Sequence, residues 1–219
     1  MGIRLGTVIG FIVGFAAVLG LMTSPAQAVT LNVDYSTIDV SGGIVVQGGV
    51  AATMTNELVG GGSAHGSLTT TAFWNAGHTL ITYEAKFIPV VNEISIISTS
   101  FAPAGLTGSI GWSFQDATNA GYVGSASTAF AAASTALGLE WDRDLSQMFW
   151  GANQQMRFFF QSTLLPGTAT FGIYNQSNAS IGSAVGLMPV AAPEPMTLLL
   201  LSSGLAGAGV WARWGRRDA

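Results

Sequence analysis

The densest group of ionisable side chains in the sequence is the run Glu140-Trp141-Asp142-Arg143-Asp144. In a β-strand, Glu140, Asp142 and Asp144 lie on one face at intervals of about 7 Å, and Trp141 and Arg143 point to the other face. Three carboxylates in such a row can bind Ca²⁺ or supply the acid and base pair of a glycosidase. The run lacks the D-x-D-x-D-G pattern of a calcium loop, so a solvated face with Trp141 packed inward is the simpler interpretation.

Other catalytic patterns are absent from the sequence. His65 and His78 are its two histidines, and they have no H-x-x-x-H or similar ligand spacing. There is no G-x-S-x-G nucleophile pattern and no cysteine, so thiol catalysis and thiolate metal sites are excluded. We therefore expect a non-enzymatic protein without a cofactor.

Aromatic residues give a second candidate site. Trp112 and Trp150 could belong to an exposed platform that stacks on sugar rings, as in a carbohydrate-binding module of the β-sandwich type. The alternative is that most of the aromatic rings form the core. In a strand, Phe158-Phe159-Phe160 sends one ring to the face opposite its two neighbours, so a ring must lie outside the core, under a helix or loop, or in a binding surface.

The composition of the body excludes one class of partner. Between the two apolar ends, nine acidic residues stand against three basic residues, which gives a net charge of −6. Nucleic acid is therefore not an expected partner, because its phosphates would be repelled.

The chemistry-bearing residues must be positioned by β-strands. Threonine, serine, valine, isoleucine and aromatic residues recur in short runs, and glycine, asparagine and proline separate these runs. The pattern predicts an all-β body, an antiparallel β-sandwich or jelly roll, because almost no amphipathic helix lies between the strands. The predicted strands are 29–34, 44–53, 67–74, 79–88, 93–101, 109–115, 138–142, 155–161 and 168–174.

Several connecting segments carry their own predictions. The alanine-rich stretch 125–137 is either a surface helix or a small-residue strand with a loop. Asn75-Ala76-Gly77 and Pro166-Gly167 are typical of turns, and Gly60-Gly61-Gly62 of a flexible loop. The predicted organisation is a signal peptide (1–28), the body (29–185), a linker (186–192) and a sorting tail (193–219).

The first 28 residues have the pattern of a secretory signal peptide. Arg4 is followed by an apolar run and then by Ala26-Gln27-Ala28, a small-residue cleavage site. Cleavage there makes Val29 the first residue of the mature chain. The apolar run is longer than usual, which leaves an uncleaved anchor as the alternative.

The last 27 residues combine a short rigid motif, an apolar segment and a basic end. The uncharged run 196–212 forms a helix of about 26 Å, just long enough to span a bilayer. Its alternative is a buried helix of a soluble domain. Basic residues that come only after the run favour the membrane helix, with a cytoplasmic C-terminus. They are Arg213, Arg216 and Arg217.

This tail resembles the PEP-CTERM sorting domain of Gram-negative bacteria. The resemblance rests on Pro193-Glu194-Pro195-x-Thr197, the leucine run, Gly204-Leu205-x-Gly207 and the terminal arginines. It implies that exosortase, a membrane protein, recognises and removes the tail, and that the protein is then released or transferred to the outside. It also implies a context of exopolysaccharide production.

Three functions are compatible with the sequence. The first is a non-catalytic protein of the cell surface or exopolysaccharide matrix, anchored briefly in the inner membrane and processed by exosortase. The second is a carbohydrate-binding module that attaches to extracellular polysaccharide. The third is an extracellular glycoside hydrolase or lyase, which requires paired carboxylates in a groove.

Overall fold

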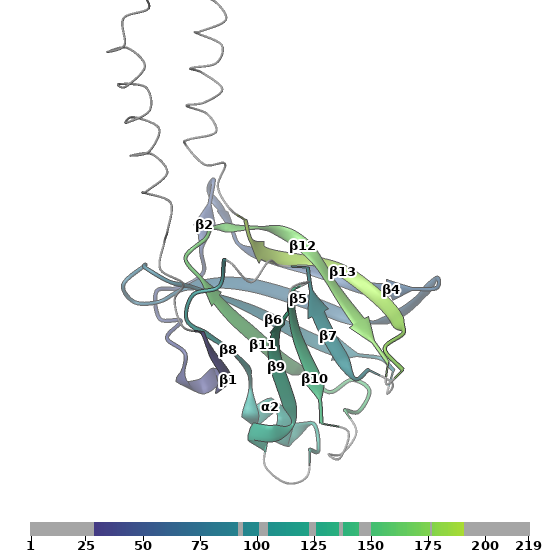
Figure 1. Cartoon of the computed structure of the whole chain (residues 1–219). Coiled ribbons are helices and arrows are strands. Elements are labelled where there is room, and N and C mark those ends of the chain that lie inside the picture. Colours follow the sequence, from purple (N-terminus) through teal and green to yellow (C-terminus); the bar gives the residue numbers. More distant parts are fainter. Residues whose placement is uncertain are drawn as a thin grey trace, which may run out of the picture.

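The computed structural model describes residues 29–91, 94–100, 105–122, 126–135, 138–144, 150–175 and 177–190 (Figure 1). Most of the regular structure in this part of the chain is β-strand, with one short α-helix, so the prediction of a β-rich body is confirmed. None of its helices has the length and apolar character that a membrane span requires. The predicted signal peptide, the Pro-Glu-Pro motif and the tail helix lie outside the described residues.

The strands are β1 (Thr30–Asp34), β2 (Val46–Gln47), β3 (Val50–Ala51), β4 (Thr53–Gly60), β5 (Ser63–Trp74), β6 (Ile81–Pro89), β7 (Ile96–Thr99), β8 (Ser109–Trp112), β9 (Phe130–Thr135), β10 (Gly138–Arg143), β11 (Met156–Ser162), β12 (Pro166–Tyr174) and β13 (Ser180–Pro189). The helical elements of the described residues are the short helix α2 (Phe114–Asn119) and the 3₁₀ turns η1 (Tyr35–Thr37) and η3 (Ala126–Thr128).

Eleven of the strands form one continuous sheet in the order β1-β8-β11-β6-β5-β4-β13-β12-β7-β10-β9. The two separate sheets of a sandwich are therefore not what the structure has. Within the eleven-stranded sheet, all neighbouring strands are antiparallel except β1 and β8, which are parallel. The sheet is nearly closed into a barrel, because its two edge strands approach each other: Ala132 of β9 donates its backbone N–H to Oδ1 of Asn32 in β1 at 2.8 Å. Closure protects both edges from pairing with other chains.

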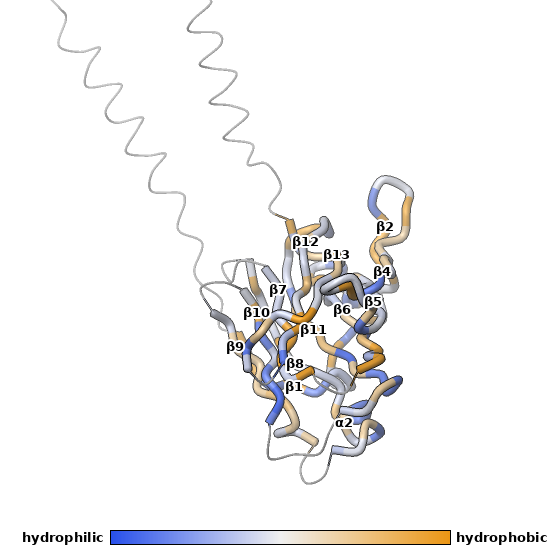
Figure 2. Tube along the Cα trace, turned by 90° about the vertical axis from the view of Figure 1, so that its right-hand side faces the viewer, coloured by the Kyte–Doolittle hydropathy of each residue, from blue (hydrophilic) through white to orange (hydrophobic). Residues whose placement is uncertain are grey.

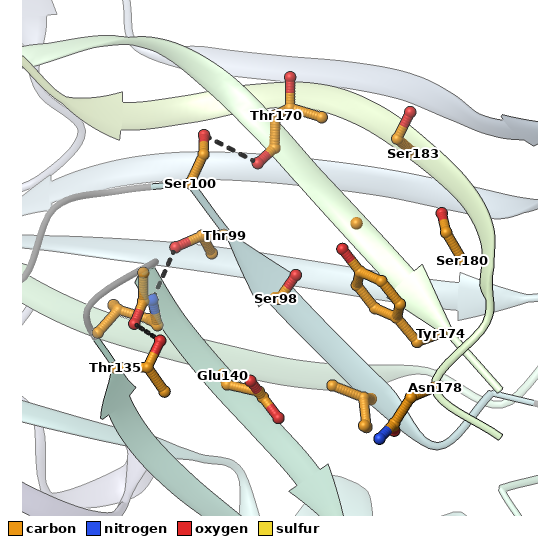
Figure 3. Close-up of a pocket in the computed structure, with 14 residues that line it drawn as sticks. Ser98, Thr99, Ser100, Thr135, Glu140, Thr170, Tyr174, Asn178, Ser180 and Ser183 are labelled. Atoms are coloured by element: carbon orange, nitrogen blue, oxygen red, sulfur yellow. Dashed lines mark hydrogen bonds between the residues drawn. The ribbon is translucent and has the colours of Figure 1, made fainter. Parts of the chain in front are cut away.

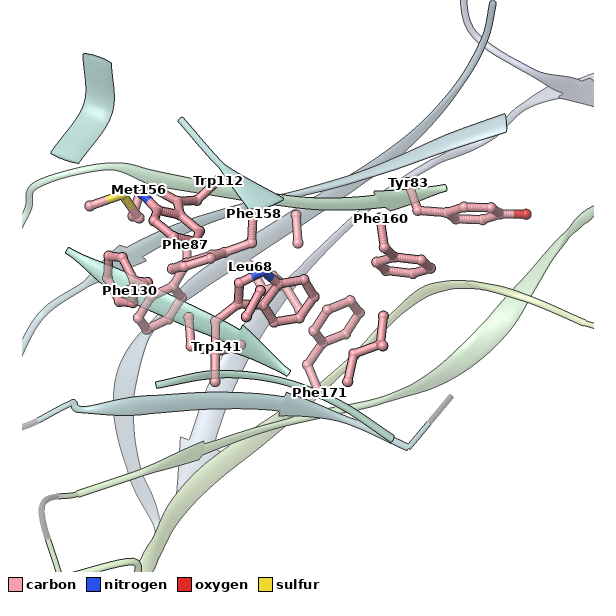
Figure 4. Close-up of a cluster of buried hydrophobic side chains, with 14 of the residues drawn as sticks. Leu68, Tyr83, Phe87, Trp112, Phe130, Trp141, Met156, Phe158, Phe160 and Phe171 are labelled. Carbon is pink, nitrogen blue, oxygen red and sulfur yellow. The ribbon is translucent and has the colours of Figure 1, made fainter. Parts of the chain in front are cut away.

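The rolled sheet encloses an aromatic core (Figure 4). Trp112, Trp141, Phe158 and Phe160 are each fully buried in it. The ring of Phe160 stacks on Tyr83 at a centroid distance of 5.2 Å, and Phe158 meets other rings edge to face or tilted. Large rings fill the space between the two halves of the sheet, which explains why a chain without disulfides can keep one shape.

One element stands apart from this core. The predicted strand 44–53 is instead the hairpin of β2 and β3, turned by Gly48 and Gly49 at positive φ. Figure 2 shows this hairpin as an arm beside the sheet, with hydrophobic residues along it. Val46 and Val50 are 62% and 70% exposed, so the arm contributes little to the core.

Three further segments differ from their predictions. Pro166-Gly167 begins β12 and is not a turn, and β13 runs through the first four residues of the predicted linker to Pro189. Gly61 and Gly62, both at positive φ, form a tight turn between β4 and β5 where a flexible loop was expected. For the alanine-rich stretch, the strand alternative is correct, since it contains η3 and β9. Asn75-Ala76-Gly77 is a turn, as predicted.

Candidate functional site

The predicted tryptophan platform does not exist. Trp112 and Trp150 are buried inside the rolled sheet, with 0% and 1% of their surfaces exposed. Their ring nitrogens donate to backbone oxygens of Ala126 and Gln154 at 3.2 and 2.8 Å. A ring that is packed on all sides and has its one donor satisfied cannot stack on a sugar, so this prediction is wrong.

The carboxylate row is partly as predicted. Glu140 and Asp142 lie on the outer face of β10, while Trp141 and Arg143 point inward. Asp144 follows the end of the strand and donates its backbone N–H to the oxygen of Ala129. Partial burial raises the pKa of the Asp142 carboxyl above its ordinary value.

The metal hypothesis gains no support from the described residues. In them no three histidine, aspartate or glutamate side chains lie close enough to hold one ion, and this includes Glu140, Asp142 and Asp144. His65 lies near the start of β5 and contacts the oxygen of Gly60 at 3.2 Å. His78 lies beyond the other end of that strand, stacked on Trp74. The two histidines therefore do not meet.

The three rings of Phe158-Phe159-Phe160 lie on both faces of β11. Phe158 and Phe160 lie in the core, and Phe159 points to the outer face of β11, where it is nevertheless fully buried. Tyr35 of η1 covers it: the centroids of the two rings lie 5.5 Å apart, and the rings meet edge to face. The expectation that one ring lies outside the core, under a helix or loop, is confirmed.

A charged cluster surrounds this cover. Glu84, only 3% exposed, pairs with Lys86 at 3.1 Å and with Arg157 at 3.6 Å, and Arg157 also pairs with Asp116 of α2 at 3.5 Å. The guanidinium of Arg157 lies over the ring of Tyr35, 4.6 Å from its centre. Through Arg157, the cluster attaches η1 and α2 to the sheet. Its two positive and two negative charges compensate each other, so the cluster has no net charge that would attract a charged ligand.

The most promising site lies on the outer face of β7, β10, β12 and β13. A hollow of about 420 Å³ opens there, lined mainly by serine and threonine hydroxyls together with Glu140, Tyr174 and Asn178 (Figure 3). We call this hollow the outer groove. Among the described residues that line it, there is no lysine or arginine.

Strand register assembles the outer groove. Ser98 of β7 pairs with Glu140 of β10 on one side and with Gly172 of β12 on the other. Gly172 pairs in turn with Ser183 of β13. These four residues form one row across four strands, and all lie on the face away from the core. In the next row, Tyr174 stands between Ile96 and Ser180.

Gly172 leaves room for the ring of Tyr174. A Cβ atom at this position would lie 3.0 Å from Cε2 and 3.1 Å from the hydroxyl of Tyr174, so the tyrosine ring lies across the space that a side chain would fill. The ring is half-buried and forms one wall of the groove. A flat ring beside a row of hydroxyls is the combination that can contact both faces and edges of a sugar.

Some of the polar groups in the groove are available to a ligand. Within the described part of the chain, the hydroxyls of Ser98, Tyr174 and Ser183 make no hydrogen bond, and the Glu140 carboxylate makes no ion pair. Ser100 and Thr135 are already bonded to backbone oxygens of Thr170 and Gly138. The groove thus combines fixed walls with free donors and acceptors.

Among these residues only Glu140 is a candidate from the sequence, as a catalytic or metal-binding carboxylate. The sequence does show the alternation of polar and apolar positions in β12, where Thr170 and Tyr174 alternate with the core residues Phe171 and Ile173. What placed them together was the pairing of β7 with both β10 and β12, which no local pattern records. Comparisons of the chain with protein-family models, with curated proteins and with solved structures find no match.

Proposed function

We propose that the chain is an exported, non-catalytic protein of the cell surface or exopolysaccharide matrix, and that its body binds extracellular polysaccharide in the outer groove. The observation that carries the binding proposal is the row Glu140, Ser98, Gly172 and Ser183, with Tyr174 beside it. Hydroxyl-rich ligands match this row, because unpaired hydroxyl and carboxylate groups exchange hydrogen bonds with sugar hydroxyls.

The export proposal rests on the two ends of the sequence. Ala26 and Ala28 provide the cleavage site of the leader, and Pro193-Glu194-Pro195 with Thr197 precedes the apolar run and its three arginines. In this proposal the partner in the membrane is exosortase, which removes the tail after the body has crossed the inner membrane. The body then reaches the cell surface or the surrounding matrix.

Binding is tested with the mature protein recovered from its host and with immobilised polysaccharides: a neutral glucan, chitosan and alginate. Tyr174→Ala removes the wall of the groove, and Ser98→Leu fills its centre. We expect each to weaken binding about tenfold or more, equivalent to roughly 1.4 kcal/mol. Val46→Ala, on the exposed arm, is the matched control and should bind like the parent.

Two outcomes would change the proposal. Retention of the parent on none of the polysaccharides, or equal retention of all variants, would remove the binding function. If the parent released reducing ends from a polysaccharide and Glu140→Gln did not, the glycoside hydrolase hypothesis would replace the proposed binding function. Circular dichroism of each variant separates loss of binding from loss of folding.

Export is tested by mass spectrometry of the protein isolated from its host. We expect an N-terminus at Val29 and a C-terminus near Pro193. Replacement of Pro193 and Pro195 by alanine should leave the tail attached, because it removes the fixed extended segment before the helix. Full-length chain in the cytosol, with Met1 and Ala219 present, would refute the export proposal.

A further inference from the structure

Two more hollows continue from the outer groove along the sheet. The first, which we call the middle hollow, has a volume of about 310 Å³ and lies between β4, β12 and β13. It shares Thr170 and Ser183 with the outer groove. The other, of about 470 Å³, lies over β4, β5 and β6. It shares Asn56 and Glu57 with the middle hollow. The three hollows therefore form a continuous path over neighbouring strands.

The path is long compared with a single sugar. It runs over the consecutive strands β10, β7, β12, β13, β4, β5 and β6. At about 4.8 Å between neighbouring strands, it covers roughly 29 Å along the sheet. A site for a monosaccharide would need only the outer groove, whereas the whole path offers room for a chain of several sugars.

The middle hollow exists because two strands separate. β13 pairs with β4 only at Ser183 and Val59, and further along it crosses to β5, where the N–H of Leu187 donates to the hydroxyl of Thr70 at 2.8 Å. The Asn56 amide bridges the gap by donating to the oxygen of Val185 at 2.6 Å. These two hydrogen bonds hold β13 beside β4 and β5 next to the middle hollow.

The charges along the path are all negative. Glu140 lies at one end, on β10, and Glu57 lies on β4, where the second and third hollows meet. The described lining of the three hollows contains no lysine or arginine. An acidic polysaccharide would be repelled by both carboxylates, since like charges across an interface disfavour binding. Sugar hydroxyls or ammonium groups, by contrast, would donate to both carboxylates.

We infer that the ligand is a polysaccharide without acidic groups, and that it lies along all three hollows. This inference rests on the proposed binding function. It assigns Glu57, with Asn56, to a second part of the site on β4. In the sheet, β4 lies four strands from β10, which carries Glu140, and this is about 19 Å at roughly 4.8 Å per strand. Affinity must then increase with the length of the sugar chain, and the increase must depend on Glu57.

The test uses calorimetry with the mature protein and three series of oligosaccharides: neutral glucan, glucosamine and alginate oligomers. The neutral and glucosamine series distinguish hydroxyl from ammonium recognition. We expect affinity to rise about tenfold or more from dimers to octamers in at least one of these two series. Alginate oligomers of any length should bind more weakly.

Glu57→Gln is expected to remove most of the increase for octamers and to leave dimer binding unchanged. Asp39→Asn is the matched control, because Asp39 is exposed and lines none of the three hollows. Length-independent binding that Tyr174→Ala abolishes would overturn this inference and leave the proposed function standing. Stronger binding of alginate would overturn it as well, and absence of all binding would overturn both.

Discussion

Three tyrosines illustrate how burial acts on single residues. Burial raises the pKa of Tyr35, Tyr83 and Tyr122 well above 10. At Tyr35 the nearby Glu84 adds to the increase. The Tyr83 hydroxyl donates to the oxygen of Leu164 at 2.7 Å, a bond that requires its proton. Each ring is therefore held in its neutral form by the fold.

The consequence is a stability that depends on alkaline pH. Below pH about 10 these tyrosines are protonated in both folded and unfolded chains. Above it, the unfolded chain loses protons that the folded chain retains, so the free energy of unfolding falls as pH rises. We expect urea midpoints to be constant from pH 8 to about 9.5 and to decrease above pH 10.

Tyr83→Phe is the informative variant in this experiment. It should lower stability by about 1 kcal/mol at pH 8, because the bond to Leu164 is lost. It should also flatten the decrease above pH 10. A midpoint that does not change between pH 8 and 11 in the parent would contradict the assignment.

At the scale of elements, Gly111 determines how β1 joins the sheet. A Cβ atom at Gly111 would lie 1.9 Å from the oxygen of Val33, so β1 can approach β8 only because this residue has no side chain. Gly111 pairs with Phe159 of β11, the residue that η1 covers. The approach of β1 and the burial of Phe159 are thus parts of one packing arrangement.

We therefore expect Gly111→Ala to displace β1 and η1. The cost should be about 1 to 3 kcal/mol, as for other overpacked sites, and it is measured from the urea midpoint. Gly77→Ala is the control, because an added Cβ there would meet its nearest neighbour at an ordinary 3.7 Å. Equal stability of the two variants would mean that β1 has room to move.

At the scale of the whole molecule, Asn32 bridges the two edges where the sheet closes. Its side chain joins β1 to β9 across the opening, by accepting the N–H of Ala132. The residue has a φ of 59°, in the left-handed region that asparagine and glycine tolerate best. It lies where the pairing of β1 with β8 shifts register.

Asn32→Gly keeps the backbone conformation and removes the acceptor. We expect it to cost about 1 to 3 kcal/mol, because the buried N–H of Ala132 loses its partner, and to speed hydrogen exchange at that amide. Asn32→Asp, which keeps an acceptor oxygen, should protect the amide almost as well as the parent. Unchanged exchange in Asn32→Gly would show that the edges are held together by other contacts.

Predictions from the local sequence pattern succeeded where the alternation of side chains along a strand decides which residues face the core. Alternation placed Trp141 inward and Glu140 outward correctly, because successive side chains of any strand point to opposite faces. It failed for β13, whose small residues have low strand propensity. Gly186 of β13 packs against Phe171, where an added Cβ atom would lie only 2.6 Å from the ring. At this position the close packing of the core requires a small residue, although glycine has a low strand propensity.

The sequence by itself indicated that the body is built of β-strands and that its charge is negative, and it predicts that the two ends are a signal peptide and a sorting tail. These properties depend on composition and on the two-residue period of a strand, both of which are local. Only the tertiary structure decided that Trp112 and Trp150 are core and that Ser98, Tyr174 and Ser183 share one groove. The reason is that β7, β12 and β13 become neighbours through long-range pairing, and such pairing depends on how the whole sheet buries its apolar face.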